Sequence, residues 1–578
     1  MQSQSGVKRY SVLGWNYLSS GQNIEVEYVR VRKPDGTVVN TPDYNIQDMT
    51  AAVSRSAPMY SDVHEKHAIV KGLSVDDVLE WSVRWRTFKP RVPGHFWYTE
   101  RFTREVIDRD QQLEITVPRD KFVKVVSSPG NDPVVKEDGA HRTYTWKHVN
   151  LQRPDPDVPV SHDSLRPDVQ LTTFKAWEEI GTWYDGLQQP QVAVTPEIQA
   201  RAAELTKGLT TDDAKTRALY AYVSTKFHYV SLSFGVGAYQ PHLAGDVLDN
   251  DYGDCKDKHT LLEALLKASG IEAWPALING TYGNIDPDVP SPAQFNHVIT
   301  YVPRSGSPVW LDATPETAPY EYLSLVLRDK KALVIPGGKP ASLRTTPANP
   351  PYPRDERFSI QGKISSEGEL TGHVQVVFRG DLEIQGRTAF LRADRADWKS
   401  VAQGISRNLG FGGQVSNVTA SNPQDTATPF ELSYDYTRKE LGHWAEHRTG
   451  VPAPGFFVER AANETRKPAD PIELGALGEI TRNATVVMDV GVIKLPADVA
   501  LSEPYAGYIS HYAMNGNTLT AVRRLMIKQN RVPVSEWESY KKFAKAIYDD
   551  VGASIQLEPT TSEQTEPKKP AGEDTTHP

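Results

Sequence analysis

The sequence predicts a multidomain protein with a β-rich N-terminal domain, a central α+β domain and a β-rich C-terminal domain that ends in a helix. Apolar and polar residues alternate with a period of two before about residue 150 and again after about residue 355, as in half-buried strands. Between these regions lie helical patterns with capping residues, followed by short apolar runs. A chain of 578 residues is long enough for several packed domains.

The N-terminal domain is expected to span residues 1–180. The segment IEVEYVRVRKPDGTVV (24–39) contains two alternating runs around a Pro-Asp-Gly turn, which indicates a β-hairpin. In LEWSVRW (79–85), the alternate residues are all large and apolar, which is typical of a strand with one covered face. The Pro- and Asp-rich segment RPDPDVPVSHD (153–163) indicates a connector.

The central domain is predicted over residues 195–340 and the C-terminal domain over residues 355–553. In the central region, Thr211 is placed to cap a helix, and three strand-like runs, AWPALIN, FNHVITYV and PVWLDA, follow later. The C-terminal domain closes with a predicted helix, VSEWESYKKFAKAIYDDVG (534–552). The polar, Pro-rich end of the chain, residues 557–578, is predicted to be disordered.

Composition and charge argue against several classes of protein. The net charge of −9 and the lack of a long basic run argue against a nucleic-acid partner, and no apolar run reaches the roughly 18 residues of a transmembrane segment. The segment HEKH (64–67) has the wrong histidine spacing for a zinc helix, and the aspartates at 249, 251 and 254 lack the spacing of a calcium loop. Neither a metal nor another cofactor is therefore expected.

The chain contains one cysteine, Cys255, in the segment DYGDCKDKHTLLEALLKASG (251–270), at the start of a predicted helix. Asp254 can cap this helix and Gly270 can end it. Unpaired N–H groups and a partial positive charge at a helix N-terminus favour a thiolate, and such sites can lower a thiol pKa from about 8.5 to between about 3.5 and 7.5. These local features leave two alternatives equally open, a nucleophile and a buried, inert cysteine.

A nucleophilic thiol needs a base, and the base needs a group that orients it. His297 in FNHVITYV and Asp312 in PVWLDATP lie on two predicted strands joined by the short loop RSGS. A register that pairs Val302 with Ser307 would place these two residues directly opposite each other, with Cβ atoms about 4.5–5.5 Å apart. If the pairing of the two strands shifted by two residues, the side chains of His297 and Asp312 would still lie on the same face of the sheet. Asp312 is then expected to hold one ring nitrogen of His297 and leave the other for the thiol.

The order Cys255, His297, Asp312 on a helix followed by two strands resembles the transglutaminase-like superfamily, a branch of the papain-like thiol enzymes. The matching pieces are YGDCKDKHTLLEALLKASGIEAWPALIN, FNHVITYV and VWLDAT, within about 195–340. The resemblance implies that Cys255 is the nucleophile, His297 the base and acid, and Asp312 the orienting carboxylate. Papain-like enzymes use an upstream glutamine in the oxyanion hole, which makes Gln240 in GAYQPHLAGDVL a candidate oxyanion residue. The papain signature around the cysteine is absent, which favours the transglutaminase-like branch.

The flanking segments resemble β-rich domains that accompany transglutaminase-like domains in many bacterial envelope proteins. This resemblance rests on VRKPDGTVVN and APMYSDVHEKHAIVKGLSVDDVLEWSVRWR before the central domain, and on VPVSEWESYKKFAKAIYDD after it. It implies an exported protein, periplasmic or outer-membrane-associated, with cell-envelope partners. The N-terminal segment MQSQSGVKRYSVLG shows no signal peptide, and the late start of the resemblance implies that a signal peptide and a first strand precede it.

The family resemblance implies an enzyme that attacks amide bonds of a protein or peptide substrate through an acyl-thioester. An amine acceptor would give cross-linking, and water would give deamidation or proteolysis. The alternative is a non-catalytic binding or scaffolding protein of the cell envelope. A degenerate triad would favour that alternative, whereas all three triad residues are present here.

Overall fold

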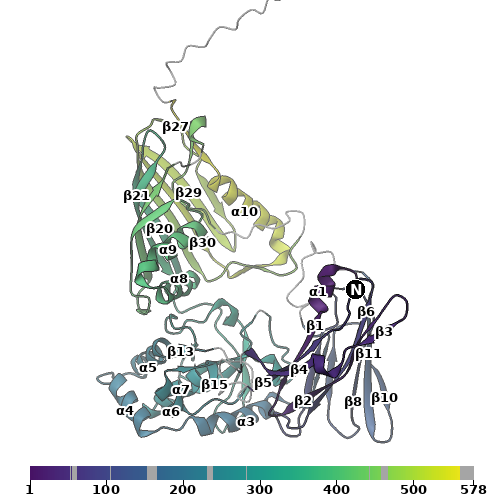
Figure 1. The fold of residues 1–578 in the computed structure, drawn as a ribbon. Helices are drawn as coiled ribbons and strands as arrows, with labels where there is room; N and C mark the ends of the chain where they lie inside the picture. Colours follow the sequence, from purple (N-terminus) through teal and green to yellow (C-terminus); the bar gives the residue numbers. More distant parts are fainter. Residues whose placement is uncertain are drawn as a thin grey trace, which may run out of the picture. The chain divides into compact units, whose positions relative to one another are not determined.

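The computed structural model describes residues 1–559 except 53, 55–61, 105, 153–165, 231–238, 282, 440, 442 and 457–466. These residues form two compact units, which are described separately (Figure 1). The first holds residues 1–154, 165–314 and 330–346, and the second holds 315–329 and the chain from 347 onward. The predicted fold class is confirmed, because β-rich regions flank a central α+β domain. The predicted connector at 153–163 and the tail from 560 lie outside the described residues.

The N-terminal part of the first unit consists mainly of short antiparallel sheets. After α1 (Gln4–Tyr10), its strands are β1 (Val12–Leu18), β2 (Gln22–Arg32), β3 (Val38–Asn40), β4 (Ile46–Thr50), β5 (Val63–Ile69), β6 (Val78–Thr87), β7 (Trp97–Glu100), β8 (Asp108–Pro118), β9 (Lys124–Ser127), β10 (Val134–Glu137), β11 (His141–Asn150) and β12 (Val169–Thr172). They form three-stranded sheets in the orders β1-β5-β4, β3-β2-β6, β10-β11-β8 and β7-β12-β9. The predicted hairpin at 24–39 is confirmed, since β2 pairs antiparallel with β3.

The strand β12 leads from these sheets into the central domain. It pairs with both β7 and β9, and its four residues are buried. The chain then forms α3 (Trp177–Gln188), a helix that the sequence analysis missed. Glu178 and Glu179 in its first turn are typical of the start of a helix, but two glycines within it weaken the helical pattern. Val92, from the N-terminal part, joins α3 residues in one buried cluster, so the two parts share a core.

The central domain packs helices against a five-stranded antiparallel sheet. Its helices are α4 (Pro196–Leu205), α5 (Asp212–Lys226), α6 (Ala244–Asn250) and α7 (Cys255–Ala268), and its strands are β13 (His228–Tyr229), β14 (Tyr252–Gly253), β15 (Trp274–Ile278), β16 (His297–Val302), β17 (Val309–Leu311), β18 (Lys331–Val334) and β19 (Ser342–Thr345). The sheet order is β17-β16-β15-β18-β19. Thr211 caps α5 and Asp254 caps α7, as predicted. Gly270 has a φ of 76°, in the left-handed region, and therefore ends the α7 segment as predicted.

The second unit is built on an eight-stranded sheet. Its strands are β20 (Arg354–Ile364), β21 (Leu370–Arg379), β22 (Gln414–Ala420), β23 (Phe430–Arg438), β24 (Arg448–Gly450), β25 (Ile472–Glu473), β26 (Gly478–Met488), β27 (Val492–Lys494), β28 (Val499–Ser502), β29 (Ala506–Asn515), β30 (Thr518–Ile527), β31 (Arg531–Val532) and β32 (Ser554–Leu557), with helices α8 (Asp381–Arg392), α9 (Trp398–Asn408) and α10 (Trp537–Val551). The order β22-β23-β21-β20-β26-β30-β29-β28 has one parallel pair, β20 with β26.

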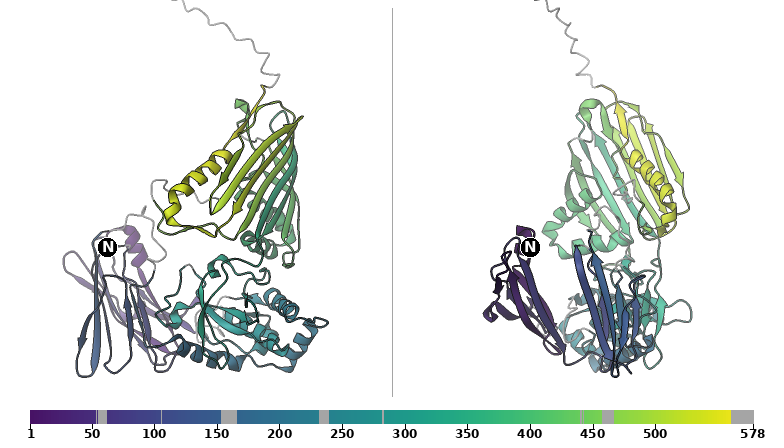
Figure 2. Two further views of the ribbon diagram at one scale, coloured as in Figure 1. Left: turned by 180° about the vertical axis from the view of Figure 1, so that it is seen from behind. Right: turned by 90° about the vertical axis from the view of Figure 1, so that its right-hand side faces the viewer.

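The predicted final helix is confirmed as α10, which lies along the sheet of its unit in both views of Figure 2. Its apolar face packs on buried residues of β26, β29 and β30. Leu557, which the sequence analysis assigned to the disordered tail, instead ends strand β32 and is buried. Among the described helices, none combines the length and apolarity that crossing a membrane requires.

The close packing of α3 gives a stability prediction with an internal control. A Cβ atom at Gly181 would lie far inside van der Waals contact of the buried Ala341 side chain, whereas Gly186 on the same helix has open space around it. Gly181→Ala should therefore lower the free energy of unfolding by about 1–3 kcal/mol. Gly186→Ala should leave it unchanged or raise it by about 0.5–1 kcal/mol. Urea unfolding measures both; equal effects at the two positions would contradict the packing.

Candidate active site

Cys255 is the first residue of α7, at a helix N-terminus that two carboxylates organise. The Asp254 side chain accepts hydrogen bonds from the backbone N–H groups of Lys256 (3.0 Å) and Asp257 (3.1 Å). In return, the Asp257 side chain accepts one from the Asp254 N–H (3.3 Å). This capping box fixes the first turn of the helix. The Cys255 side chain is half-buried and packs at the edge of a buried apolar cluster.

The charged residues that follow Cys255 are buried, and each has polar partners. Lys256 forms an ion pair with Asp254, and Lys258 donates to two backbone carbonyls at the end of α5, at 3.1 and 2.7 Å. His259 was expected at a solvated helix position, and this expectation is wrong. Its side chain is buried, with Nδ1 2.8 Å from Thr300 Oγ1, because the β16 strand covers that face of the helix.

His297 and Asp312 form a hydrogen-bonded pair beside the sheet edge. His297 opens β16, and Asp312 directly follows β17. The distance from His297 Nε2 to Asp312 Oδ2 is 3.1 Å. The other carboxylate oxygen of Asp312 accepts hydrogen bonds from the N–H (3.0 Å) and Oγ1 (2.7 Å) of Thr314. Since Nε2 is held by the carboxylate, Nδ1 is the ring nitrogen available to a thiol.

The predicted register of these two strands is wrong by two residues. Val302 pairs with Val309, not with Ser307. His297 therefore does not lie directly opposite Asp312. A slip of two residues keeps both side chains on the same face of the sheet, because side chains alternate with a period of two. The contact survives as a diagonal one, which long side chains can span.

The pKa values of the pair shift in opposite directions. Burial by itself would lower the pKa of His297, but the Asp312 carboxylate, followed by Cys255, raises it well above its ordinary value. Burial would raise the pKa of Asp312, but His297 and Thr314 lower it instead. The pair is thus arranged to hold an imidazolium next to a carboxylate at neutral pH. A histidine in this state can stabilise a neighbouring thiolate.

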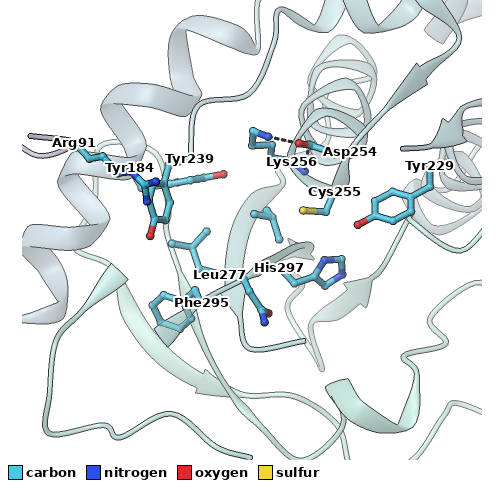
Figure 3. Close-up of a pocket in the computed structure, with 12 residues that line it drawn as sticks. Arg91, Tyr184, Tyr229, Tyr239, Asp254, Cys255, Lys256, Leu277, Phe295 and His297 are labelled. Carbon is cyan, nitrogen blue, oxygen red and sulfur yellow. Dashed lines mark hydrogen bonds and ion pairs between the residues drawn. The ribbon is translucent and has the colours of Figure 1, made fainter. Parts of the chain in front are cut away.

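Cys255 and His297 line one cavity of about 140 Å³. Figure 3 shows the thiol and the imidazole on one side of it, with Arg91, Tyr184 and Tyr239 across from them. Its remaining lining residues are Tyr229, Asp254, Lys256, Leu277, Phe295, Asn296 and Val298. The structure thus brings Cys255, His297 and Asp312 together, with Asp312 behind the imidazole. Gln240 does not line this cavity; it is exposed and borders a neighbouring hollow.

Tyr184 is a residue of this cavity that the sequence analysis missed. It belongs to α3, its side chain is buried, and its hydroxyl has no hydrogen-bond partner among the residues that the structure describes. Burial, followed by the charges of Cys255 and Asp254, raises the pKa of Tyr184 well above its ordinary value. The phenol therefore stays protonated and can donate a hydrogen bond. Its position in the sequence indicates only an apolar helix face, so no local pattern places it in this cavity.

Comparisons with known proteins identify three domains in this chain. Residues 199–300 match the model of the transglutaminase-like superfamily. Residues 1–155 match a domain of unknown function with a solved structure, DUF3857, and residues 454–557 match a second one, DUF3858. The chain therefore carries a transglutaminase-like domain flanked by these two domains, as its sequence resemblance implied.

One solved structure has a similar fold over nearly the whole chain. The crystal structure of a protein from Parabacteroides distasonis, described as a candidate protease, covers 96% of this chain and 94% of its own chain with a TM-score of 0.65 at 15% identity. A structure from Cytophaga hutchinsonii, described as a candidate cysteine protease, covers 44% of this chain and 84% of its own at 13% identity. Its TM-score of 0.20 is too low for an argument about fold. No curated protein matches this chain.

Proposed function

We propose that this protein is a thiol enzyme that breaks amide bonds of protein or peptide substrates, with Cys255 as nucleophile. The observation that carries the proposal is the position of His297, which shares a cavity with Cys255 and is held through Nε2 by the buried Asp312. Membership of the central domain in the transglutaminase-like superfamily supports the same reading. The similarity to a structure described as a candidate protease is a similarity of fold. It does not decide whether water or an amine accepts the acyl group.

The reaction proceeds in two halves. In the first, the Cys255 sulfur attacks the amide carbonyl while His297 carries the thiol proton, and His297 then gives this proton to the departing amine. The C–N bond breaks and a thioester remains. In the second half, His297 removes a proton from water or an amine, which attacks the thioester and releases the thiol. Asp312 keeps the imidazole oriented and stabilises its charged form throughout.

The oxyanion that forms during attack needs hydrogen-bond donors that face the attacked carbonyl oxygen inside the cavity. The backbone N–H of Cys255 is one, since it lies in the first turn of α7 and has no acceptor among the described residues. We assign the second donor to the Tyr184 hydroxyl, which is buried in the same cavity. Gln240, the residue proposed from the family resemblance, lies outside the cavity in this structure.

The reaction is tested with a peptide library prepared from a bacterial lysate and supplied with a small primary amine. The purified full chain should modify a subset of peptides, and Cys255→Ala should modify none. Product masses separate hydrolysis of a peptide bond, deamidation of glutamine and incorporation of the amine. A thioester adduct on Cys255, trapped at low pH, would identify the intermediate. Equal products with the wild type and Cys255→Ala would reject the proposal.

The role of Tyr184 predicts opposite effects on catalysis and on stability. Tyr184→Phe removes only the hydroxyl and should lower kcat by about 10²–10³-fold, the loss typical of one oxyanion donor. The free energy of unfolding should stay constant or increase, because the lost hydroxyl is a buried group that has no hydrogen-bond partner among the described residues. Kinetics and urea unfolding measure the two effects.

Tyr434→Phe is the matched control, since Tyr434 is also a fully buried tyrosine but lies in the second unit. It should have the same small effect on stability and no effect on kcat. A Tyr184→Phe enzyme with full activity would reject the assignment.

We also propose that the protein acts in the periplasm or at the outer membrane, with cell-envelope partners. This proposal rests on the resemblance of the flanking domains to those of bacterial envelope proteins and on the matches to DUF3857 and DUF3858. Fractionation of the native host, followed by detection with an antibody, tests it. Recovery of the protein in the cytosolic fraction would contradict it.

A further inference from the structure

A second hollow, of about 240 Å³, adjoins the cavity that contains Cys255. Arg91 and Tyr239 line both spaces, so the two spaces lie next to each other. The second hollow is formed largely by the N-terminal part of the first unit, from the turn between β1 and β2 and from the segment after β6. Trp183 of α3 contributes an aromatic wall. An extended substrate that reaches Cys255 can therefore also contact the N-terminal domain.

The charges along this hollow are all positive. Of the described residues, Lys89 and Arg91 line it, and no described aspartate or glutamate does. Within the described part of the chain, neither of these two cations forms an ion pair. In the adjoining cavity the one carboxylate is that of Asp254, and Lys256 already neutralises it. The combined space thus presents two uncompensated positive charges in a protein whose net charge is −9.

The segment that carries these cations is anchored at both ends. The backbone N–H groups of Phe88 and Lys89 both donate to the carbonyl of Gly21, at 3.0 and 3.2 Å. On the other side, Val92 is buried in the apolar cluster shared with α3. Between these anchors, the Arg91 guanidinium lies over the Tyr239 ring, 5.6 Å from its centroid. The backbone of this segment and the Arg91 side chain are therefore held at the hollow, which lowers the entropic cost of binding an anion.

We infer that the two spaces form one substrate groove, in which an acidic stretch of polypeptide binds Lys89 and Arg91 while its reacting amide reaches Cys255. This inference rests on the proposed function and names its substrate class. Carboxylate side chains match the charge of the groove, and arginine can hold a carboxylate through two hydrogen bonds. The amide chemistry of the thiol favours a peptide over other polyanions. The N-terminal domain thereby becomes part of substrate recognition.

Binding is tested on the full chain with Cys255→Ala, so that no turnover occurs. Fluorescence anisotropy compares fluorescein-labelled hexaglutamate, hexaglutamine and hexalysine. Hexaglutamate should bind best, and its affinity should fall as salt is added, because exposed charges are screened. In this background, Arg91→Gln or Lys89→Gln should weaken hexaglutamate binding by about tenfold each, the effect of losing one charge-assisted contact. Binding of hexaglutamine should stay unchanged.

Arg86→Gln is the matched control, because Arg86 is an exposed arginine on β6 that lines neither space. It should leave hexaglutamate binding within twofold of the parent. Equal binding of hexaglutamate and hexaglutamine would overturn the inference, and so would an equal loss in Arg86→Gln. A hexathymidylate that competes as well as unlabelled hexaglutamate would show general anion binding and would also overturn it.

A second measurement separates this inference from the proposed function. The wild-type chain is given the peptide library, and the modified sites are sorted by the charge of their flanking residues. Enrichment of aspartate and glutamate that disappears in Arg91→Gln supports both proposals. Turnover without any acidic preference would reject the groove and leave the thiol enzyme intact. Acid-selective binding without turnover would reject the enzyme and leave the groove as a binding site.

Discussion

His297→Ala is expected to lower the rate of amide cleavage by about 10⁴-fold and to change how alkylation of Cys255 depends on pH. In the proposed mechanism His297 is the acid and base of both half-reactions, so its loss would remove proton transfer from each. In the wild type, the raised pKa of His297 keeps an imidazolium beside the thiol. Iodoacetamide should therefore react rapidly down to about pH 6, where an ordinary thiol has become slow.

Alkylation reports on one residue, because the chain has a single cysteine. Intact mass after labelling should show one adduct, and the rate in His297→Ala should fall steeply with decreasing pH. His373→Ala is the control, since His373 also pairs with an aspartate, Asp435, but on the exposed face of a strand in the second unit. It should behave as the wild type. A cysteine that labels only after unfolding would contradict the enzyme and favour a binding protein with an inactive transglutaminase-like fold.

Asp312→Asn is expected to lower kcat by about 10⁴-fold as well, through the orientation and charge of the imidazole. An asparagine cannot stabilise the imidazolium, and its amide favours the wrong histidine tautomer. KM should change far less than kcat, because Asp312 does not line the substrate cavity. Asp435→Asn, which alters the exposed pair with His373, is the control and should leave both constants unchanged.

The same substitution predicts a change in the pH dependence of stability. The pKa of Asp312 is lowered by folding, so its contribution is present above its unfolded value of about 3.9 and is lost as the pH falls through the folded value. The pKa of His297 is raised, so its contribution is present below about 6.5 and is lost as the pH rises through the folded value. The wild type should therefore exceed Asp312→Asn in unfolding free energy most between about pH 4 and 6.5. A difference that is constant from pH 4 to 9 would contradict this coupling.

Local signals were sufficient to predict the fold class, and together with the family resemblance they predicted three residues, Cys255, His297 and Asp312, that the structure brings together. The alternation of apolar and polar residues predicted β2 and β26, and capping residues predicted where α5 and α7 begin. These features depend on contacts within a few residues, which a sequence displays directly. The triad followed from the order of a cysteine helix and two strands, together with the family resemblance. The predicted β16–β17 register was wrong by two residues, but His297 and Asp312 still lie on the same face of the sheet, because side chains alternate with a period of two.

Other features of the site depend on contacts between distant segments, which no local pattern encodes. The helix α3 brings Tyr184 into the cavity from about 70 residues before Cys255, and the segment after β6 brings Arg91 from farther still. The same long-range packing buries His259. Gln240 is close in sequence to Cys255 and still lies outside its cavity. The sequence by itself therefore determined the fold class through local periodicity and capping, and with the family resemblance it predicted Cys255, His297 and Asp312 as one group of residues. Only the tertiary structure decided which side chains surround the thiol, because burial and proximity arise when segments far apart in the chain pack into one core.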